Sequence, residues 1–142
     1  MEKFAGTIAI VTGGSAGIGK ALIKRLLEKS VDLTVVGLAR RPIEEFASFS
    51  NFRGFQCDVS KADQVQAVIS SIQHEFPGKS VQLLVNNAGH GKPLPLLDHS
   101  SLNDSCTIKV DSLEEVSSVY ASQLNTNVLG LSLMTRAVSS PR

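Results

Sequence analysis

Cysteine is scarce in this sequence, and the placement of its two cysteines excludes a metal centre. Cys57 and Cys106 stand far apart, with no C-x-x-C pair and no histidine at ligand spacing. This pattern argues against a zinc site, and a chain of this length needs no disulfide to hold its core. Free thiols fit a reducing compartment. We therefore expect a cytoplasmic protein without a bound metal.

Excess charge and long apolar runs are also missing. Lysine and arginine total 14 against 13 acidic residues, which leaves a net charge of +1. The basic residues are scattered, so we expect no nucleic-acid partner. The apolar run Ile8–Val11 is too short for a signal peptide, and no run approaches the roughly 18 apolar residues of a membrane-spanning helix. We expect neither a targeting segment nor a membrane span.

Short β-branched runs alternate with helical patterns along the chain. With 142 residues, 42% of them apolar, the chain can bury a core within one domain. The alternation predicts an α/β fold with a doubly wound parallel sheet and crossover helices. The expected strands are Thr7–Thr12, Leu33–Leu38, Gly54–Cys57 and Val81–Val85.

Apolar residues at helical spacing occupy the segments between these strands. Ser112 and Glu115 form a capping box ahead of one such segment. The final apolar segment, Leu124–Val138, predicts a helix that is buried on most sides. The expected helices run from Gly19 onward, from Pro42 toward Ala47, from Ser60 to the stop at Pro77-Gly78, from Leu113 to Leu124 and from Leu124 to Val138.

A glycine-rich loop, Thr12–Gly19, joins the first strand to the first helix. A strand, a tight turn and a helix N-terminus together direct backbone N–H groups toward one point, which is the Rossmann-type site for a pyrophosphate. Gly13 permits the turn, Gly17 lets phosphates approach the backbone, and Gly19 allows close packing of helix and strand. The loop residues expected to bind the coenzyme are Gly13, Ser15, Gly17, Ile18 and Gly19.

A second phosphate-binding motif overlaps this loop. Gly14–Lys20 spells G-x-x-x-x-G-K, the core of a P-loop. Ala21 stands where a serine or threonine would hold magnesium, and no apolar strand downstream ends in an aspartate. The sequence therefore favours a dinucleotide over a nucleoside triphosphate.

The end of the second strand indicates which dinucleotide. An acidic residue at this position binds the ribose hydroxyls of NAD, whereas a basic residue accepts the 2′-phosphate of NADP. Here the strand is followed by Arg40 and Arg41, and a guanidinium can pair with phosphate through its planar fork. We therefore expect NADP rather than NAD, with a solvated pair of loop arginines as the alternative.

Four short motifs follow one another along the chain. They are Thr12-Gly13-x-x-x-Gly17-Ile18-Gly19, Cys57-Asp58-Val59, Asn86-Asn87-Ala88-Gly89 and Asn127-Val128-Leu129-Gly130. In this order they resemble the short-chain dehydrogenase/reductase family, over Phe4 to about Val138. The stretch Val35–Arg41 is most similar to the NADP-dependent, farnesol-dehydrogenase-like branch. The resemblance implies hydride transfer between NADPH and a small-molecule carbonyl or alcohol substrate.

The resemblance also implies roles for further residues. Asp58 would hydrogen-bond the adenine amino group, and Val59 would pack near the ring. Asn127 would join a proton relay, although it is equally a polar residue that satisfies helix backbone. The ribose beside the nicotinamide would be lined by Asn87, Ala88 and Gly89.

The catalytic residues of the family are not found in this sequence. Family members use a Tyr-x-x-x-Lys pair, in which the tyrosine exchanges a proton with the substrate and the lysine lowers its pKa. The only tyrosine here is Tyr120, four positions before Leu124, and no lysine follows Lys109. We therefore expect a truncated chain whose residues 1–142 form a single, incomplete NAD(P)-binding domain. We also expect an insertion within residues 100–113.

Two functions remain open at this point. The chain is the coenzyme-binding part of an NADP-dependent oxidoreductase, or it is a non-catalytic, truncated isoform that binds a nucleotide or a partner. In either case we expect the 142 residues alone to be inactive. The helix Leu124–Val138 resembles an interface helix of the family. It would expose apolar surface, which predicts a homo-oligomer.

Overall fold

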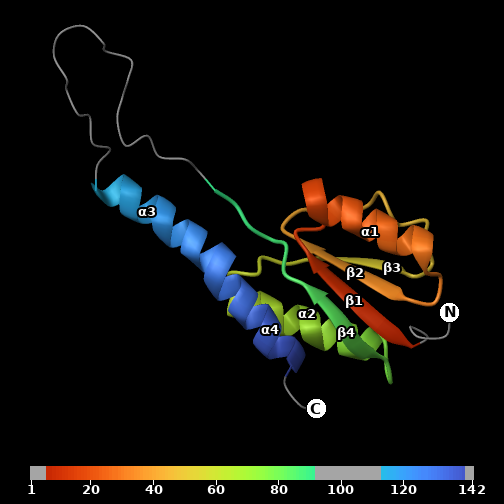
Figure 1. The fold of residues 1–142 in the computed structure, drawn as a ribbon. Helices are drawn as coiled ribbons and strands as arrows, with labels where there is room; N and C mark the ends of the chain where they lie inside the picture. Colours follow the sequence, from red (N-terminus) through yellow and green to blue (C-terminus); the bar gives the residue numbers. More distant parts are fainter. Residues whose placement is uncertain (1–5, 92–112, 140–142) are drawn as a thin grey trace, which may run out of the picture.

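The computed structural model describes residues 6–91 and 113–139 and confirms the predicted α/β fold. In these residues four parallel strands form one sheet in the order β3-β2-β1-β4 (Figure 1). This is the Rossmann arrangement, in which the chain crosses over the sheet between successive strands. The strands are β1 (Thr7–Thr12), β2 (Thr34–Ala39), β3 (Phe52–Gln56) and β4 (Ser80–Val85).

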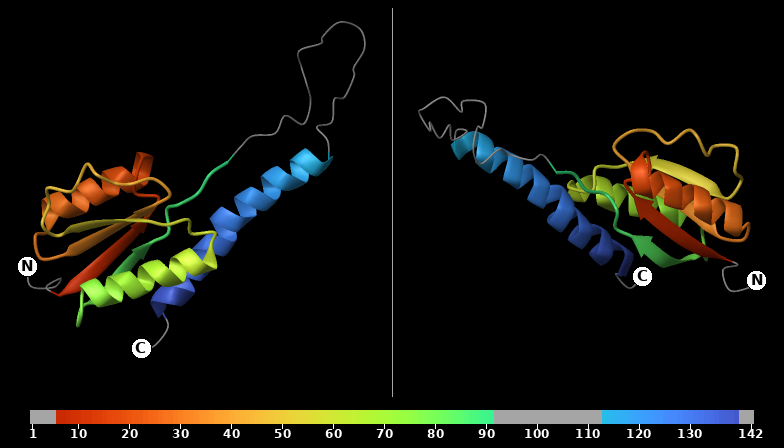
Figure 2. Two further views of the ribbon diagram at one scale, coloured as in Figure 1. Left: turned by 180° about the vertical axis from the view of Figure 1, so that it is seen from behind. Right: turned by 45° about the horizontal axis from the view of Figure 1, so that its top comes forward.

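Helices cover both faces of the sheet. Figures 1 and 2 show α1 (Gly17–Lys29) on one face and α2 (Ala62–Glu75) with α4 (Leu131–Ser139) on the other. A six-residue π-helix, η2 (Asn125–Gly130), connects α3 (Leu113–Leu124) to α4. The three segments form one long rod, and α3 projects away from the sheet (Figure 2).

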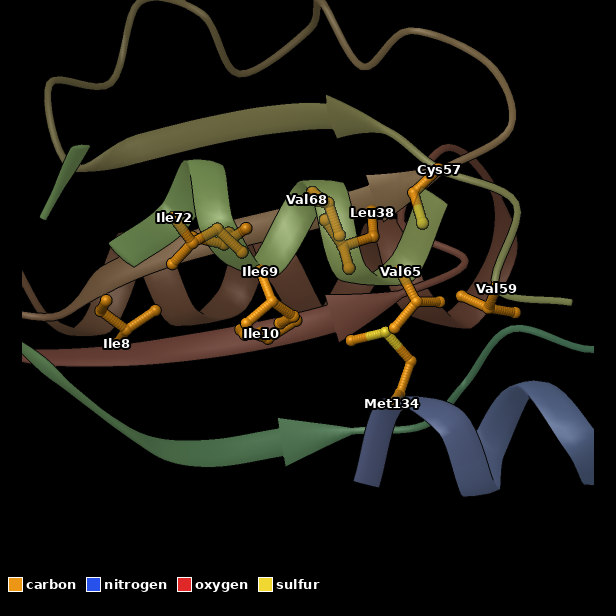
Figure 3. Close-up of a cluster of buried hydrophobic side chains, with 11 residues drawn as sticks. Ile8, Ile10, Leu38, Cys57, Val59, Val65, Val68, Ile69, Ile72 and Met134 are labelled. Atoms are coloured by element: carbon orange, nitrogen blue, oxygen red, sulfur yellow. The ribbon is translucent and has the colours of Figure 1, made fainter. Parts of the chain in front are cut away.

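Alternate residues of β1 build two cores. Ile8 and Ile10 point toward α2 and α4, where they join a buried cluster that includes Ile69 and Met134 (Figure 3). Ala9 and Val11 belong to the cluster on the α1 side. All six residues of β1 are buried, which explains why the strand is almost continuously apolar.

The short helix expected from Pro42 toward Ala47 does not form, and that prediction was wrong. This segment makes turns instead, which bury Phe46 against the edge of the Phe52 ring at a centroid distance of 5.4 Å. Burial of a phenylalanine stabilises the fold more than one isolated helical turn would. The next strand, β3, begins at Phe52, two residues before its expected start.

The helix expected over Leu124–Val138 is interrupted, and the expectation that it is buried on most sides was wrong. In η2 and α4 only Gly130 and Met134 are buried among the described side chains. Gly130 packs tightly on Val59, because a Cβ at Gly130 would lie 2.8 Å from Val59 Cγ2. The expected exposed apolar surface is present, and its side chains include Leu124, Val128, Leu129 and Leu131.

Two predictions fall on residues outside the described ranges. Ser112, the first residue of the expected capping box, is one of them. The expected insertion in 100–113 is the other, apart from Leu113, where α3 begins. Among the described helices, none is long and apolar enough to cross a membrane.

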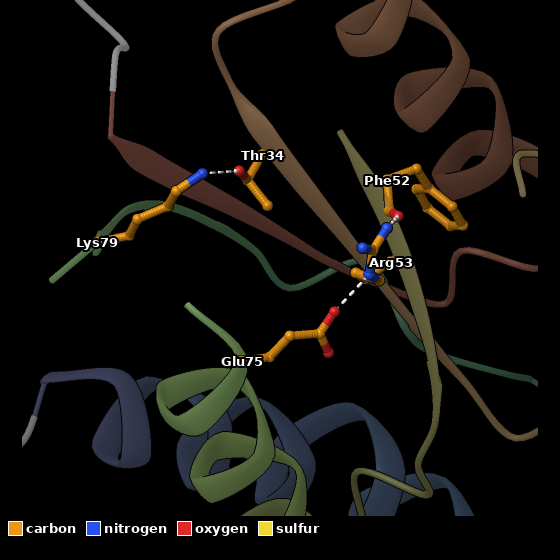
Figure 4. A network of polar contacts seen from close by, with 5 residues as sticks. All are labelled: Thr34, Phe52, Arg53, Glu75 and Lys79. Atoms are coloured by element: carbon orange, nitrogen blue, oxygen red, sulfur yellow. Dashed lines mark hydrogen bonds and ion pairs between the residues drawn. The ribbon is translucent and has the colours of Figure 1, made fainter. Parts of the chain in front are cut away.

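Polar side chains link separate elements near the amino ends of the strands. Lys79 Nζ, just before β4, donates a 2.8 Å hydrogen bond to Thr34 Oγ1 in β2 (Figure 4). Arg53 in β3 pairs with Glu75 of α2 and also donates to the Phe52 carbonyl oxygen at 2.7 Å. These contacts hold the amino ends of the strands and leave their carboxyl ends open for a site.

Candidate nucleotide-binding site

A cavity of about 890 Å³ lies at the carboxyl ends of the strands. Of the twelve residues predicted to bind the coenzyme, eleven line it. The twelfth, Gly19, does not line the cavity. The lining residues that were predicted are Gly13, Ser15, Gly17, Ile18, Arg40, Arg41, Asp58, Val59, Asn87, Ala88 and Gly89.

The loop from Gly13 to Gly17 exposes backbone to this cavity. Gly13 and Gly17 adopt φ values of +70° and +55°, which side-chain-bearing residues rarely do. A Cβ at Gly17 would meet nothing within 4 Å, so the space in front of it is open. No side chain caps α1, because its N-cap residue is Ala16. The first N–H groups of the helix therefore remain available to an anion.

Gly19 packs closely against the glycine loop and Asn87. A Cβ there would lie 2.5 Å from both the Gly13 carbonyl oxygen and Asn87 Nδ2. The close approach expected of Gly19 is present, but it is made with the loop and with Asn87. Gly19 therefore shapes the cavity without lining it.

Thr12, at the end of β1, joins the glycine loop to the segment after β4. Its hydroxyl donates to the Val85 carbonyl oxygen at 3.3 Å and accepts the N–H groups of Asn87 at 3.0 Å and Ala88 at 2.9 Å. Asn87 Nδ2 in turn donates to the Thr12 carbonyl oxygen at 3.0 Å. The sequence analysis did not predict a role for Thr12, although a hydroxyl at the end of a buried apolar strand was the available signal.

Charged side chains gather where β2 and β3 end. Arg40 and Arg41 are exposed at the cavity, and Asp58 lies partly buried beside them. Partial burial raises the pKa of Asp58, but hydrogen bonds from the Ser60 hydroxyl and N–H, with Arg40 and Lys61 nearby, hold that pKa below its usual range. Asp58 is therefore ionised at neutral pH and caps its own loop.

Cys57 forms part of the cavity wall as a buried thiol. Burial, followed by the charges of Asp58 and Asp63, raises its pKa to about 11. It is therefore a neutral thiol at pH 7. No group of three or more possible metal ligands occurs among the residues that the structure describes.

Asn127 of η2 does not line the cavity but holds a residue that does. Its Oδ1 accepts the His90 N–H at 3.0 Å, and its Nδ2 donates to the His90 carbonyl oxygen at 2.9 Å. The expected relay role stays a prediction, and the observed role is to fix the segment after β4. Thr126 also lines the cavity. Neither His90 nor Thr126 was predicted, because no motif marks them.

Comparisons with known proteins agree with this geometry. The sequence model described as short chain dehydrogenase matches residues 7–141. Dehydrogenase/reductase SDR family member 11 of Mus musculus is 32% identical over 96% of this chain, and farnesol dehydrogenase of Aedes aegypti is 35% identical over 96%. These alignments cover 48% and 51% of those proteins. The chain thus spans about half the length of the curated relatives it matches.

Solved structures show the same fold. An NADPH-bound carbonyl reductase from chicken fatty liver superposes with a TM-score of 0.72 at 24% identity, over 95% of this chain and 50% of that one. The closed form of serine dehydrogenase complexed with NADP+ gives a TM-score of 0.69 at 26% identity, over 94% and 48%. The four-stranded sheet and its helices thus correspond to about half of each of these structures.

Proposed function

The chain belongs to the short-chain dehydrogenase/reductase family of oxidoreductases, and we propose that it binds NADP(H) in preference to NAD(H). The observation that carries this proposal is the convergence of eleven predicted residues on one cavity, with two arginines at the end of β2. The 26% identical serine dehydrogenase complexed with NADP+ supports it. As in the family, the whole protein would act on a small-molecule carbonyl or alcohol, and we propose a cytoplasmic location.

The residues of the cavity fit the parts of the coenzyme. The open backbone at Gly17 and the uncapped start of α1 suit a diphosphate, which needs N–H donors and no nearby Cβ. Arg40 and Arg41 suit a 2′-phosphate. The ionised carboxylate of Asp58 suits an amino-group donor on the adenine. Asn87, Ala88 and Gly89, held by the Thr12 hydroxyl, would line the second ribose.

The chemistry of hydride transfer is supplied by the nicotinamide, and the protein positions it. In this chain the only tyrosine is Tyr120, which is 54% exposed and lies on α3 without a lysine four positions later. We therefore propose that the 142-residue chain binds the coenzyme but does not reduce carbonyls by itself. A non-catalytic binding module is the second candidate function, favoured by the same missing pair. Steady NADPH oxidation with a panel of aldehydes and ketones would contradict inactivity.

The coenzyme preference depends on Arg40. The variant Arg40→Gln is expected to lose roughly tenfold or more in NADPH affinity, because a charge-assisted hydrogen bond contributes about 1.5–3 kcal/mol. NADH affinity should hardly change, since NADH lacks the 2′-phosphate. Calorimetric titration of both coenzymes measures this. Arg25→Gln is the control, because Arg25 is exposed on α1 and does not line the cavity. Equal affinity of the parent for NADPH and NADH would remove Arg40 from the proposed role.

We further propose that two copies of the chain associate through the α3–α4 rod. Its exposed apolar side chains include Tyr120, Leu124, Val128 and Leu131, at 54%, 59%, 56% and 46% exposure. No charged residue occurs from Val116 to Thr135. In an antiparallel pair centred on Thr126, Leu124 would lie opposite Val128 and Tyr120 close to Leu131, so the apolar positions are self-complementary.

If two copies associate in this way, one lysine introduced into the apolar surface of each chain should disrupt the dimer. Leu124→Lys should shift the chain to monomer at tens of micromolar, because it places two buried charges near the two-fold axis. Sedimentation velocity measures the shift. Ser118→Lys is the matched control, since it adds the same charge to an exposed residue of α3 that is not one of these apolar positions. A parent that is monomeric at this concentration, or equal dissociation of both variants, would contradict the proposed interface.

A further inference from the structure

His90 is a titratable residue in the cavity wall that the proposed function does not use. It follows Gly89 and lines the cavity together with Thr126. His90 follows β4 and Asp58 follows β3, and these are the outer strands of the sheet. The charged side chains of Arg40, Arg41 and Asp58 line the same cavity.

Three hydrogen bonds hold His90 in place. Asn127 pairs with both its backbone N–H and its carbonyl oxygen. Its ring Nε2 lies 3.3 Å from Ser122 Oγ in α3. A serine hydroxyl can donate to a neutral imidazole nitrogen or accept from a protonated one. Ser122 can thus hold the ring in one position in both protonation states, so that only the charge of the ring changes.

Among residues 6–91 and 113–139, few other groups near His90 can change charge. The Gly13–Ala16 loop and the segment Asn86–Gly91 contain no other ionisable side chain, and η2 contains none. On α3 the ionisable side chain closest in sequence to Ser122 is that of Tyr120. The pKa of Asp58, also in the cavity wall, is held below its usual range, so Asp58 stays ionised between pH 5.5 and 8. Cys57, with its pKa raised to about 11, stays a thiol.

Histidine is the side chain that changes charge in this pH range. NADP(H) carries several negative charges on its phosphates, and besides His90 the basic side chains among the described lining residues are Arg40 and Arg41. We propose that His90 is a charge-sensing residue of the coenzyme site, whose protonated ring strengthens binding of the anionic dinucleotide as the pH falls. This inference rests on the proposed function, because it requires that the cavity accept the coenzyme.

We expect His90 to make the affinity for NADPH depend on pH. A unit charge in a partly solvated cavity, several ångströms from a phosphate, changes affinity by about three- to tenfold. Calorimetric titrations with NADPH at pH 5.5 and 8 should show that the parent gains this factor over His90→Gln at the lower pH. The two proteins should bind alike at pH 8. Because both meet the same ligand, titration of the coenzyme's own phosphate cancels in their ratio.

Two further variants sharpen the test. His90→Lys carries a fixed charge. The contribution of the ligand's own titration is measured with His90→Gln. After this correction, the NADPH affinity of His90→Lys at pH 8 should equal that of the parent at pH 5.5. His74→Gln should behave as the parent, since His74 is exposed on α2 and does not line the cavity. If the parent and His90→Gln change equally with pH, the inference is overturned and the proposed function stands. If the parent binds no coenzyme at either pH, both are overturned.

Discussion

Replacing Gly19 with alanine is expected to destabilise the chain by about 2–4 kcal/mol, the range of severe overpacking. The new Cβ would lie 2.5 Å from the Gly13 carbonyl oxygen and from Asn87 Nδ2. The carbonyl oxygen belongs to the backbone, so it cannot turn aside as a flexible side chain would. Either the first turn of α1 or the glycine loop must move. Urea unfolding followed by circular dichroism measures the loss.

The matched control for this variant is Gly91→Ala. Gly91 has an ordinary φ and nothing within 4 Å of its Cβ position. We expect its free energy of unfolding to change by about 0.5 kcal/mol or less, as for other surface substitutions. Gly19→Ala should also weaken NADPH binding at temperatures where it remains folded, because the displaced loop is the proposed diphosphate cradle. A Gly19→Ala protein as stable as Gly91→Ala would contradict the close packing.

Replacing Thr12 with valine is expected to cost about 2–4 kcal/mol of stability without changing the volume of the core. Valine keeps the shape but removes the acceptor of the Asn87 and Ala88 N–H groups and the donor to Val85. Part-buried N–H groups that lose their acceptor cost about 1–3 kcal/mol each. Urea unfolding again measures the change, and calorimetry follows the accompanying loss of NADPH affinity.

Thr12→Ser separates the hydroxyl from the methyl group. Serine keeps the three hydrogen bonds and loses one buried methyl, so we expect a loss of about 1 kcal/mol and nearly unchanged NADPH affinity. If the serine and valine variants lose the same free energy of unfolding, the hydroxyl does not link β1 to the segment after β4. If valine is tolerated, the three polar groups must find other partners.

The parts of the fold that sequence could predict are those set by local pattern. The apolar run of β1 and the glycines after it identified the first strand, the loop and the start of α1, because each signal involves neighbouring residues. Fixed motifs after the other strands identified the rest of the cavity lining. Parallel strands bring their carboxyl ends to one edge, so the motifs had to converge once the sheet formed.

The parts that could not be predicted depend on contacts between distant residues. Phe46 leaves a helical pattern because Phe52, in another element, offers a place to bury it. The π-helical turn places Gly130 against Val59 and Asn127 against His90, and no local spacing encodes either contact. His90 carries no motif, and Thr12 begins the glycine motif but was given no role of its own. Their roles follow only from which backbone groups lie beside them in the folded chain.

The Thr12 hydroxyl also has a consequence for the order of folding. It joins residues that are 73 to 76 positions apart in the chain. Closing so long a loop costs entropy before any contact compensates for it, and such contacts slow folding. The α1 side of the sheet, built from residues close in sequence, can therefore form first. The cavity is complete only when β4 docks beside β1, so a bound coenzyme would report that this late step has taken place.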